Sequence, residues 1–180
     1  MRWEARAQGG RSELQVAATA RISNNRMVGV AGTSNAMLTI GAAQIDHTVT
    51  VVLTPGAQTT LDQQIGDGVG IFDGARAALS GTKLDANGRA GIVLRDSGKK
   101  ADGSGVDVSV SGVTIGGSPL GVAANKGTAN SDGMLKAGGI AMNGVAEPSR
   151  FDAKLDVQSS PCDHAKADAD CAPARPGAGK

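Results

Sequence analysis

The chain has 180 residues and a formal net charge of +1, from 18 basic and 17 acidic residues. This length allows one domain with a continuous core, and the balanced charge with one Trp, two Phe and no Tyr argues against nucleic acid as a partner. No run of 18 apolar residues is present, so we expect no membrane-spanning helix.

Composition divides the chain into three zones. Residues 1–13 are polar and charged, residues 14–157 alternate short apolar runs with turn residues, and residues 158–180 are rich in Pro, Ala and Asp. The start, with Arg2, Glu4 and Arg6, is unlike a secretory signal peptide. We predict one central domain with a flexible polar arm at each end.

Short apolar runs in the central zone predict strands. In chain order the candidates are 14–22, 27–30, 36–40, 47–53, 69–72, 89–94, 106–115, 119–123, 134–145 and 151–157. In the clearest of them, 106–115, valines alternate with polar residues, and Gly112 is interpreted as a bulge. Turn dipeptides such as Asp73-Gly74 separate the runs. Strand candidates at intervals of roughly 8 to 14 residues predict an all-β fold, an antiparallel β-sandwich with less than about 10% helix.

No internal repeat of fixed period is evident, which argues against a solenoid or a propeller. Because aromatic residues are nearly absent, the sandwich core is expected to be aliphatic. Asn87 and Gly88 predict a tight turn, in which Gly88 can take a positive φ. The predicted core residues are Val51, Leu53, Ile71, Ile92, Leu94, Val108, Val110, Ile115 and Ile140.

Two patterns could hold a ligand, and neither is complete. The glycines of 66–70 precede an expected strand, whereas a phosphate-binding loop needs a helix after it. Scattered oxygen ligands for calcium lack the twelve-residue loop that ends in Glu. These possible calcium ligands are Asp62, Asp67, Asp73, Asp85 and Asn87. We therefore predict no cofactor and no metal.

The histidines and cysteines do not predict catalysis. His47 follows Asp46 and is expected on the surface at a strand end, and His164 lies in the tail. Neither is placed with a nucleophile and an orienting carboxylate, so we predict that the protein is not an enzyme. Cys162 and Cys171 could close a small disulfide loop or stay as free thiols, and their spacing is too wide for a zinc site built from cysteine pairs.

Residues 69–113 run from a Gly-apolar strand through the turn Asp85-Ala86-Asn87-Gly88 and an aliphatic strand to an alternating valine strand. This order resembles the bacterial immunoglobulin-like domains of the invasin and intimin type, and the turn is also similar to that of prealbumin-like and carboxypeptidase-regulatory sandwiches. The absence of Tyr departs from the tyrosine corner of antibody-type domains. The resemblance implies an immunoglobulin-like β-sandwich that serves as a rigid spacer or adhesive module, without catalytic residues.

Two functions follow as expectations. The first is a non-enzymatic structural or adhesive module displayed on a bacterial surface or filament, for which the tail cysteines favour an oxidising, extracellular setting. The alternative is a bacteriophage virion component, such as a capsid decoration, tail or fibre protein, that assembles through strand edges and terminal arms. In both, the partners are copies of the chain or neighbouring structural subunits. A third class, an enzyme or small-molecule binder, is supported only by the glycines and scattered aspartates.

Overall fold

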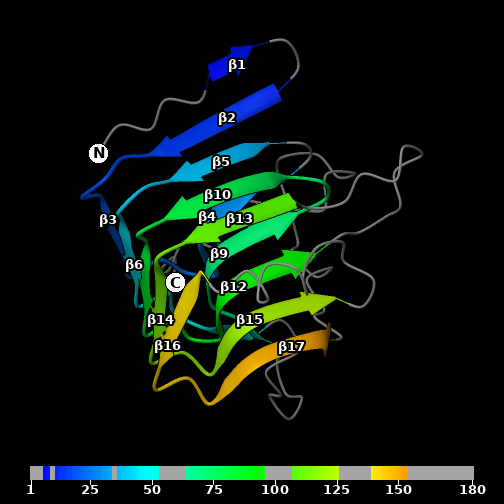
Figure 1. Ribbon diagram of the computed structural model, residues 1–180. Coiled ribbons are helices and arrows are strands. Elements are labelled where there is room, and N and C mark those ends of the chain that lie inside the picture. Colours follow the sequence, from blue (N-terminus) through cyan, green and yellow to red (C-terminus); the bar gives the residue numbers. More distant parts are fainter. Residues whose placement is uncertain are drawn as a thin grey trace, which may run out of the picture.

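The structure is a computed structural model of the chain, and every regular element that it describes is a strand (Figure 1). It describes residues 6–8, 11–33, 36–52, 64–95, 107–125 and 139–153. The strands are β1 (Arg6–Gln8), β2 (Arg11–Val16), β3 (Arg21–Ser23), β4 (Val28–Gly32), β5 (Met37–Ile40), β6 (Gln44–Asp46), β7 (Val51–Val52), β8 (Gln64–Ile65), β9 (Asp67–Phe72), β10 (Arg76–Ser80), β11 (Lys83–Asp85), β12 (Ala90–Arg95), β13 (Asp107–Ser111), β14 (Val113–Gly116), β15 (Leu120–Asn125), β16 (Ile140–Asn143) and β17 (Glu147–Ala153). Within these ranges no helix is long and apolar enough to span a membrane.

The described residues form three five-stranded sheets and one two-stranded sheet. Sheet A has the order β1-β2-β5-β10-β13, sheet B the order β3-β6-β11-β14-β16, and sheet C the order β4-β9-β12-β15-β17. Neighbouring strands are parallel in all three sheets, apart from the antiparallel pair β1 and β2. From β2 to β15 the chain runs through sheets A, B and C in turn and then begins the next coil, and Figure 1 shows the strands of each sheet stacked on one another. The architecture is a parallel β-helix.

The prediction of an antiparallel, immunoglobulin-like β-sandwich is therefore wrong, although the chain is all-β as expected. Alternation of apolar and polar residues shows which face of a strand is buried, but it does not fix the direction of the neighbouring strand. The segment 69–113 that resembles an immunoglobulin-like domain contributes strands to all three sheets. Gly112, interpreted as a bulge, has a φ of 61° and lies at the corner where the chain leaves sheet A for sheet B.

The chain is a solenoid despite the lack of a fixed sequence period, because its coils differ in length. Equivalent corner residues Thr48 and Asn87 are 39 residues apart, whereas Asn87 and Ser118 are 31 apart. The longer interval contains the antiparallel pair of β7 and β8, which is inserted between sheets B and C. Insertions of this kind remove the constant period by which a repeat is recognised in a sequence.

The core consists of aliphatic side chains that point inward from the three sheets. In sheet B the stacked residues are Ile22, Ile45, Leu84, Ile115 and Met142. Among the predicted core residues, Ile71, Ile92, Leu94 and Ile115 are fully buried in the same cluster. Val108, Val110 and Ile140 are partly buried and pack against it, and Val51 is half-buried on β7. Leu53 lies outside the described residues.

Sheet A extends into the predicted N-terminal arm. Strand β1 and the first residues of β2 precede Leu14, where the central domain was expected to begin, and Glu13 is in register with Met37 of β5. The expected tail 158–180 lies outside the described residues, and Cys162, His164 and Cys171 lie there with it.

Candidate functional site

The corner between sheets B and C has the same construction in each coil. In the described part of the chain the corner has five copies, at residues 21–25, 44–48, 83–87, 114–118 and 141–145. In each copy the second residue is apolar and points into the core, and the third points outward. The fourth residue has a positive φ between 49° and 62°. Those positive-φ residues are Asn24, His47, Ala86, Gly117 and Gly144. The repeated change of backbone direction turns the chain from sheet B toward sheet C.

Backbone hydrogen bonds join these corners from coil to coil. The positive-φ residue of one coil donates its amide to the carbonyl of the outward residue in the next coil. The four donor and acceptor pairs are Asn24 to Asp46 (3.2 Å), His47 to Asp85 (3.1 Å), Ala86 to Gly116 (2.9 Å) and Gly117 to Asn143 (3.1 Å). The corners therefore form a continuous hydrogen-bonded column.

Buried polar side chains line the inside of this column. Asn87 Oδ1 accepts from the amide of Thr48 at 3.3 Å, and Asn87 Nδ2 donates to the carbonyl of Ile45 at 3.4 Å. The Asn87 amide donates to Ser118 Oγ at 3.2 Å. Thr48, Asn87 and Ser118 are almost completely buried. The side chains of Asn87 and Ser118 satisfy backbone groups that the turn would otherwise leave unpaired in the interior.

Asn87 and Gly88 do not form the tight turn, with Gly88 at positive φ, that the sequence predicts. The positive φ is at Ala86, one residue earlier, and Gly88 is not among the positive-φ residues. The lack of a side chain at Gly88 matters for another reason, because a Cβ there would overlap Thr50 Oγ1 and lie 3.0 Å from the carbonyl oxygen of Thr48. Gly88 permits close packing of the inserted segment on the corner.

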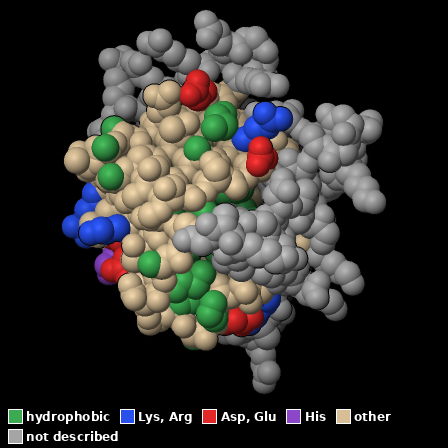
Figure 2. All heavy atoms as spheres, in the orientation of Figure 1, with side chains coloured by type: hydrophobic (Ala, Val, Ile, Leu, Met, Phe, Trp, Pro, Cys, Tyr) green, Lys and Arg blue, Asp and Glu red, His purple; other side chains and the backbone are tan. Residues whose placement is uncertain are grey.

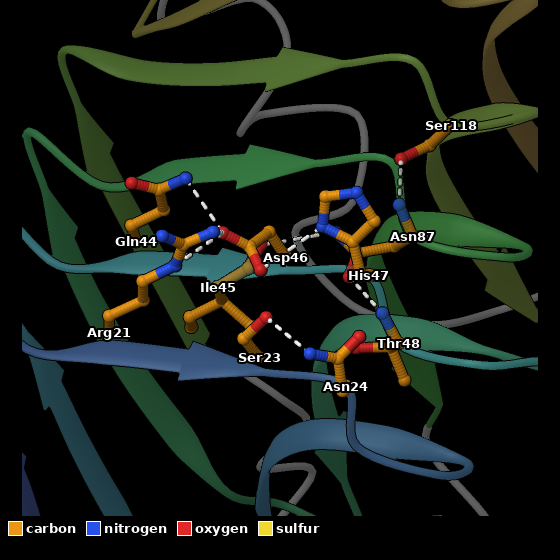
Figure 3. Close-up of polar contacts among 10 residues, drawn as sticks. All are labelled: Arg21, Ser23, Asn24, Gln44, Ile45, Asp46, His47, Thr48, Asn87 and Ser118. Atoms are coloured by element: carbon orange, nitrogen blue, oxygen red, sulfur yellow. Dashed lines mark hydrogen bonds and ion pairs between the residues drawn. The ribbon is translucent and has the colours of Figure 1, made fainter.

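The outward side of the column carries a cluster of polar side chains around Asp46, which we call the Asp46 cluster: Arg21, Ser23, Gln44, Asp46 and His47 (Figure 3). Arg21 Nε and Nη2 each lie 3.1 Å from Asp46 Oδ2, and Gln44 Nε2 donates to the same oxygen at 2.7 Å. On the other side, His47 Nδ1 lies 3.2 Å from Asp46 Oδ1. The Asp46 side chain is fully buried, whereas those of Arg21 and His47 are 62% and 57% exposed.

The neighbours of Asp46 stabilise its ionised form. Burial by itself raises the pKa of the Asp46 carboxyl, but hydrogen bonds from Ser23 and His47 and the positive charge of Arg21 together outweigh it. The pKa of Asp46 therefore lies below its ordinary value of 3.8. The cluster is a carboxylate held by donors on both sides.

The Asp46 cluster contains a histidine oriented by a carboxylate, which is one part of a hydrolytic site. Among the described residues, no hydroxyl or thiol forms a hydrogen bond with the His47 ring. Ser23 Oγ instead accepts from Asn24 Nδ2 at 3.1 Å. His47 lies at an exposed corner, where its ring contacts Asp46.

A second ion pair lies on the outer side of sheet C. Arg89 Nε and Nη2 donate to the two oxygens of Asp67 at 2.8 and 2.5 Å, and both side chains are fully buried. Beside them is a small buried cluster on the same side: Phe72, Ala90, Val93, Leu120 and Ala123. Burial raises the pKa of Asp67, while the Arg89 guanidinium and the amides of Ala90 and Gly66 oppose that rise. Arg89 Nη1 has no hydrogen-bond partner within the described part of the chain.

The residues considered for phosphate or calcium binding are dispersed. Residues 66–70 run into strand β9, and a Cβ on Gly68 would lie 2.8 Å from the carbonyl oxygen of Gly91. Asp67 pairs with Arg89, and Asp73 contacts Arg95 at 3.6 Å. Asp85 is exposed, Asn87 is inside the corner, and Asp62 lies outside the described residues. The described residues contain no group of three or more His, Cys, Asp or Glu that could hold a metal ion.

Sequence reasoning missed the Asp46 cluster and the pair of Asp67 with Arg89. The five corner copies share a pattern that could have revealed the column: an aliphatic residue, a small or polar residue, a residue at positive φ and, in four copies, Asn, Thr or Ser. Comparison with protein-family models, with curated proteins and with solved structures found no match for the chain.

Proposed function

We propose that the chain is a non-enzymatic structural module that joins copies of itself end to end through sheet B. The observation that carries this proposal is the position of β3 and β16. They are the first and last strands of sheet B, and among the described residues each has a hydrogen-bonded neighbour on one side only. An unpaired strand edge is a template for pairing with another chain.

The hydrogen bonds of β3 identify the groups that are free to pair. Gln44 donates to the carbonyl of Ala20, and Asn24 donates to the carbonyl of Asp46, so alternate residues of this segment face β6. By the alternation of a strand, the backbone groups of Arg21 and Ser23 face away from it. β16 can supply the complementary edge of another copy in the same parallel orientation as its own neighbour β14.

Sheet B is a better place for this contact than sheets A and C. In sheet A, β1 already pairs with β2 at the N-terminal end. In sheet C, the last strand β17 contains Pro148, and a proline removes a backbone donor from an edge strand. Joining β3 of one copy to β16 of the next is a heterologous contact, which repeats into a filament unless it closes into a ring.

The surface of the module fits a structural role. Figure 2 shows scattered charged side chains and no large patch of one sign on the visible face of the described residues. The donors around Asp46 are engaged with its carboxylate. The two settings expected from the sequence, a bacterial surface or filament and a phage virion, remain predictions.

Hydrogen exchange as a function of protein concentration tests the proposal. Because β3 and β16 have only three and four residues, we expect weak association that is visible by light scattering at high concentration. The amides of Arg21 and Ser23 should gain protection as the protein associates. The amides of Ile45 and Leu84, in the interior strands β6 and β11, are matched controls and should stay protected throughout. A chain that stays monomeric, with exchange at Arg21 and Ser23 independent of concentration, would overturn the proposal.

A further inference from the structure

The sequence contains two Asn-Gly pairs, Asn87-Gly88 and Asn143-Gly144. In such a pair the amide nitrogen of the glycine can attack the side-chain carbonyl carbon of the asparagine. The new C–N bond closes a succinimide ring, and the side-chain nitrogen leaves as ammonia. Water then opens the ring to aspartate or isoaspartate, so the reaction requires no other reactant. Glycine is the most permissive second residue because it has no side chain to hinder the attack.

The structure protects the first pair. Asn87 is almost completely buried, and its side chain accepts from Thr48 and donates to Ile45. The amide of Gly88, which would be the nucleophile, donates to the carbonyl of Thr48 at 2.9 Å. Both the attacking and the attacked groups are fixed in hydrogen bonds inside the corner column.

The second pair lies at the end of that column. Asn143 and Gly144 are both exposed. In each earlier coil the equivalent positive-φ residue donates its amide to the following coil, as Gly117 does to Asn143. Within the described residues Gly144 has no following corner above it, and its amide has no acceptor. The backbone amide that donates to the following coil in the other four described corners therefore has no acceptor at Gly144 within the same described ranges.

We propose that Asn143-Gly144 is a site of spontaneous deamidation in the folded protein, and that Asn87-Gly88 is protected from the same reaction. The isoaspartate product adds a methylene group to the backbone at Asn143. That change displaces the carbonyl that accepts from Gly117 and shifts the pairing of Gly116 with Asn143. Modification therefore loosens β16 from β14, independently of whether β16 also joins another copy.

Peptide mapping by mass spectrometry, with separation of asparagine, aspartate and isoaspartate forms, tests this proposal. The full chain is incubated in mildly alkaline buffer, once folded and once in denaturant. In the folded protein we expect conversion at Asn143 to be at least about tenfold faster than at Asn87, because reaction at Asn87 must wait for local opening of the corner. In denaturant the two pairs should convert at similar rates.

Two variants separate the chemistry from the fold. Asn143→Gln should abolish the modification at this position and leave Asn87 unchanged. Gly144→Ala should slow it, and this change is compatible with the fold because Ala86 occupies the equivalent position with a φ of 49°. In modified protein, the Gly117 amide should lose protection from hydrogen exchange. Equal conversion at Asn87 and Asn143 in the folded chain, or an intact Asn143 after Asn87 has converted, would overturn the proposal.

Discussion

Asp46 and Asp67 are both fully buried carboxylates, and each is paired with an arginine from another coil. Their surroundings nevertheless differ. The Arg21 side chain that binds Asp46 is 62% exposed, and Gln44 and His47 also contact this carboxylate. The Arg89 side chain that binds Asp67 is completely buried beside an apolar cluster. The pKa of Asp46 is lowered and that of Asp67 is raised by the same competition between burial and donors.

The difference in exposure of the two arginines explains the opposite pKa shifts of the two carboxylates. At the exposed corner, Asp46 meets cationic and polar groups that keep their own contact with water, so its ionisation stabilises the fold. On the outer side of sheet C, both members of the pair have lost their water. Each of the two desolvated charges compensates the other. Removing one of them therefore lowers the free energy of unfolding by more than the intact pair adds to it. Substitutions at Arg89, Asp46 and Arg21 test this difference between the two pairs.

The largest effect is expected for Arg89→Ala. This change leaves the Asp67 carboxylate buried without its partner, and we expect a loss of about 3 to 5 kcal/mol in the free energy of unfolding at neutral pH. Urea denaturation measures this loss. Replacing both members, as in Arg89→Met with Asp67→Leu, should recover most of it, because no uncompensated charge is then buried. A cost below about 1 kcal/mol for Arg89→Ala would show that Asp67 is hydrated.

A smaller effect is expected for Asp46→Asn. The amide keeps the size of the side chain but loses the charge-assisted hydrogen bonds, so we expect a loss of about 1 to 3 kcal/mol. Urea midpoints of the variant and of the original chain give the value. Asp85→Asn is the matched control, because Asp85 occupies the same position in the next coil and is exposed. An equal effect of the two changes would contradict the special position of Asp46.

The pH dependence of the Asp46 contribution has a defined sign. Because the pKa of Asp46 is lower in the folded chain than its ordinary value of 3.8, folding favours the ionised form. The stabilisation is complete above pH 3.8 and is lost as the pH falls through the folded pKa. The stability difference between the original chain and Asp46→Asn should therefore be constant near neutral pH and shrink below 3.8. A difference that grows on acidification would contradict this assignment.

The smallest effect is expected for Arg21→Ala. Arg21 is largely exposed, and exposed ion pairs contribute about 0 to 1 kcal/mol. Gln44 and His47 still contact Asp46 in this variant. Its cost should therefore fall well below that of Arg89→Ala in the same urea titration. If the two arginine variants were equally destabilised, the contrast between the exposed and the buried pair would not hold.

The sequence predicted the strands better than their arrangement. Ile92 and Ile115 are buried, and the alternating run 106–115 corresponds to β13 and β14. The predicted direction of pairing is wrong because the parallel strands of the three sheets pair with strands that lie a whole coil away, beyond the reach of local turn patterns. Gly112 illustrates this. The sequence pattern predicts a bulge within one strand there, whereas Gly112 takes a positive φ at the corner between sheets A and B.

The charged sites were missed for the same reason. Arg21 is 25 residues from Asp46, and Arg89 is 22 residues from Asp67. Only the return of the chain in successive coils brings the members of each pair together. His47 was expected on the surface at a strand end, and it is exposed at the corner after β6. Its contact with Asp46 and the positive φ at that corner are not predicted by the sequence alone.

The parallel coil is the basis of both carboxylate sites and of the corner column, and hydrogen-bond scalar couplings measured by NMR test it most directly. In the parallel β-helix, couplings are expected from the His47 amide to the Asp85 carbonyl and from the Ala86 amide to the Gly116 carbonyl, across strands of successive coils. Couplings that instead join strands adjacent in sequence, such as β11 and β12, in antiparallel register would contradict the parallel β-helix.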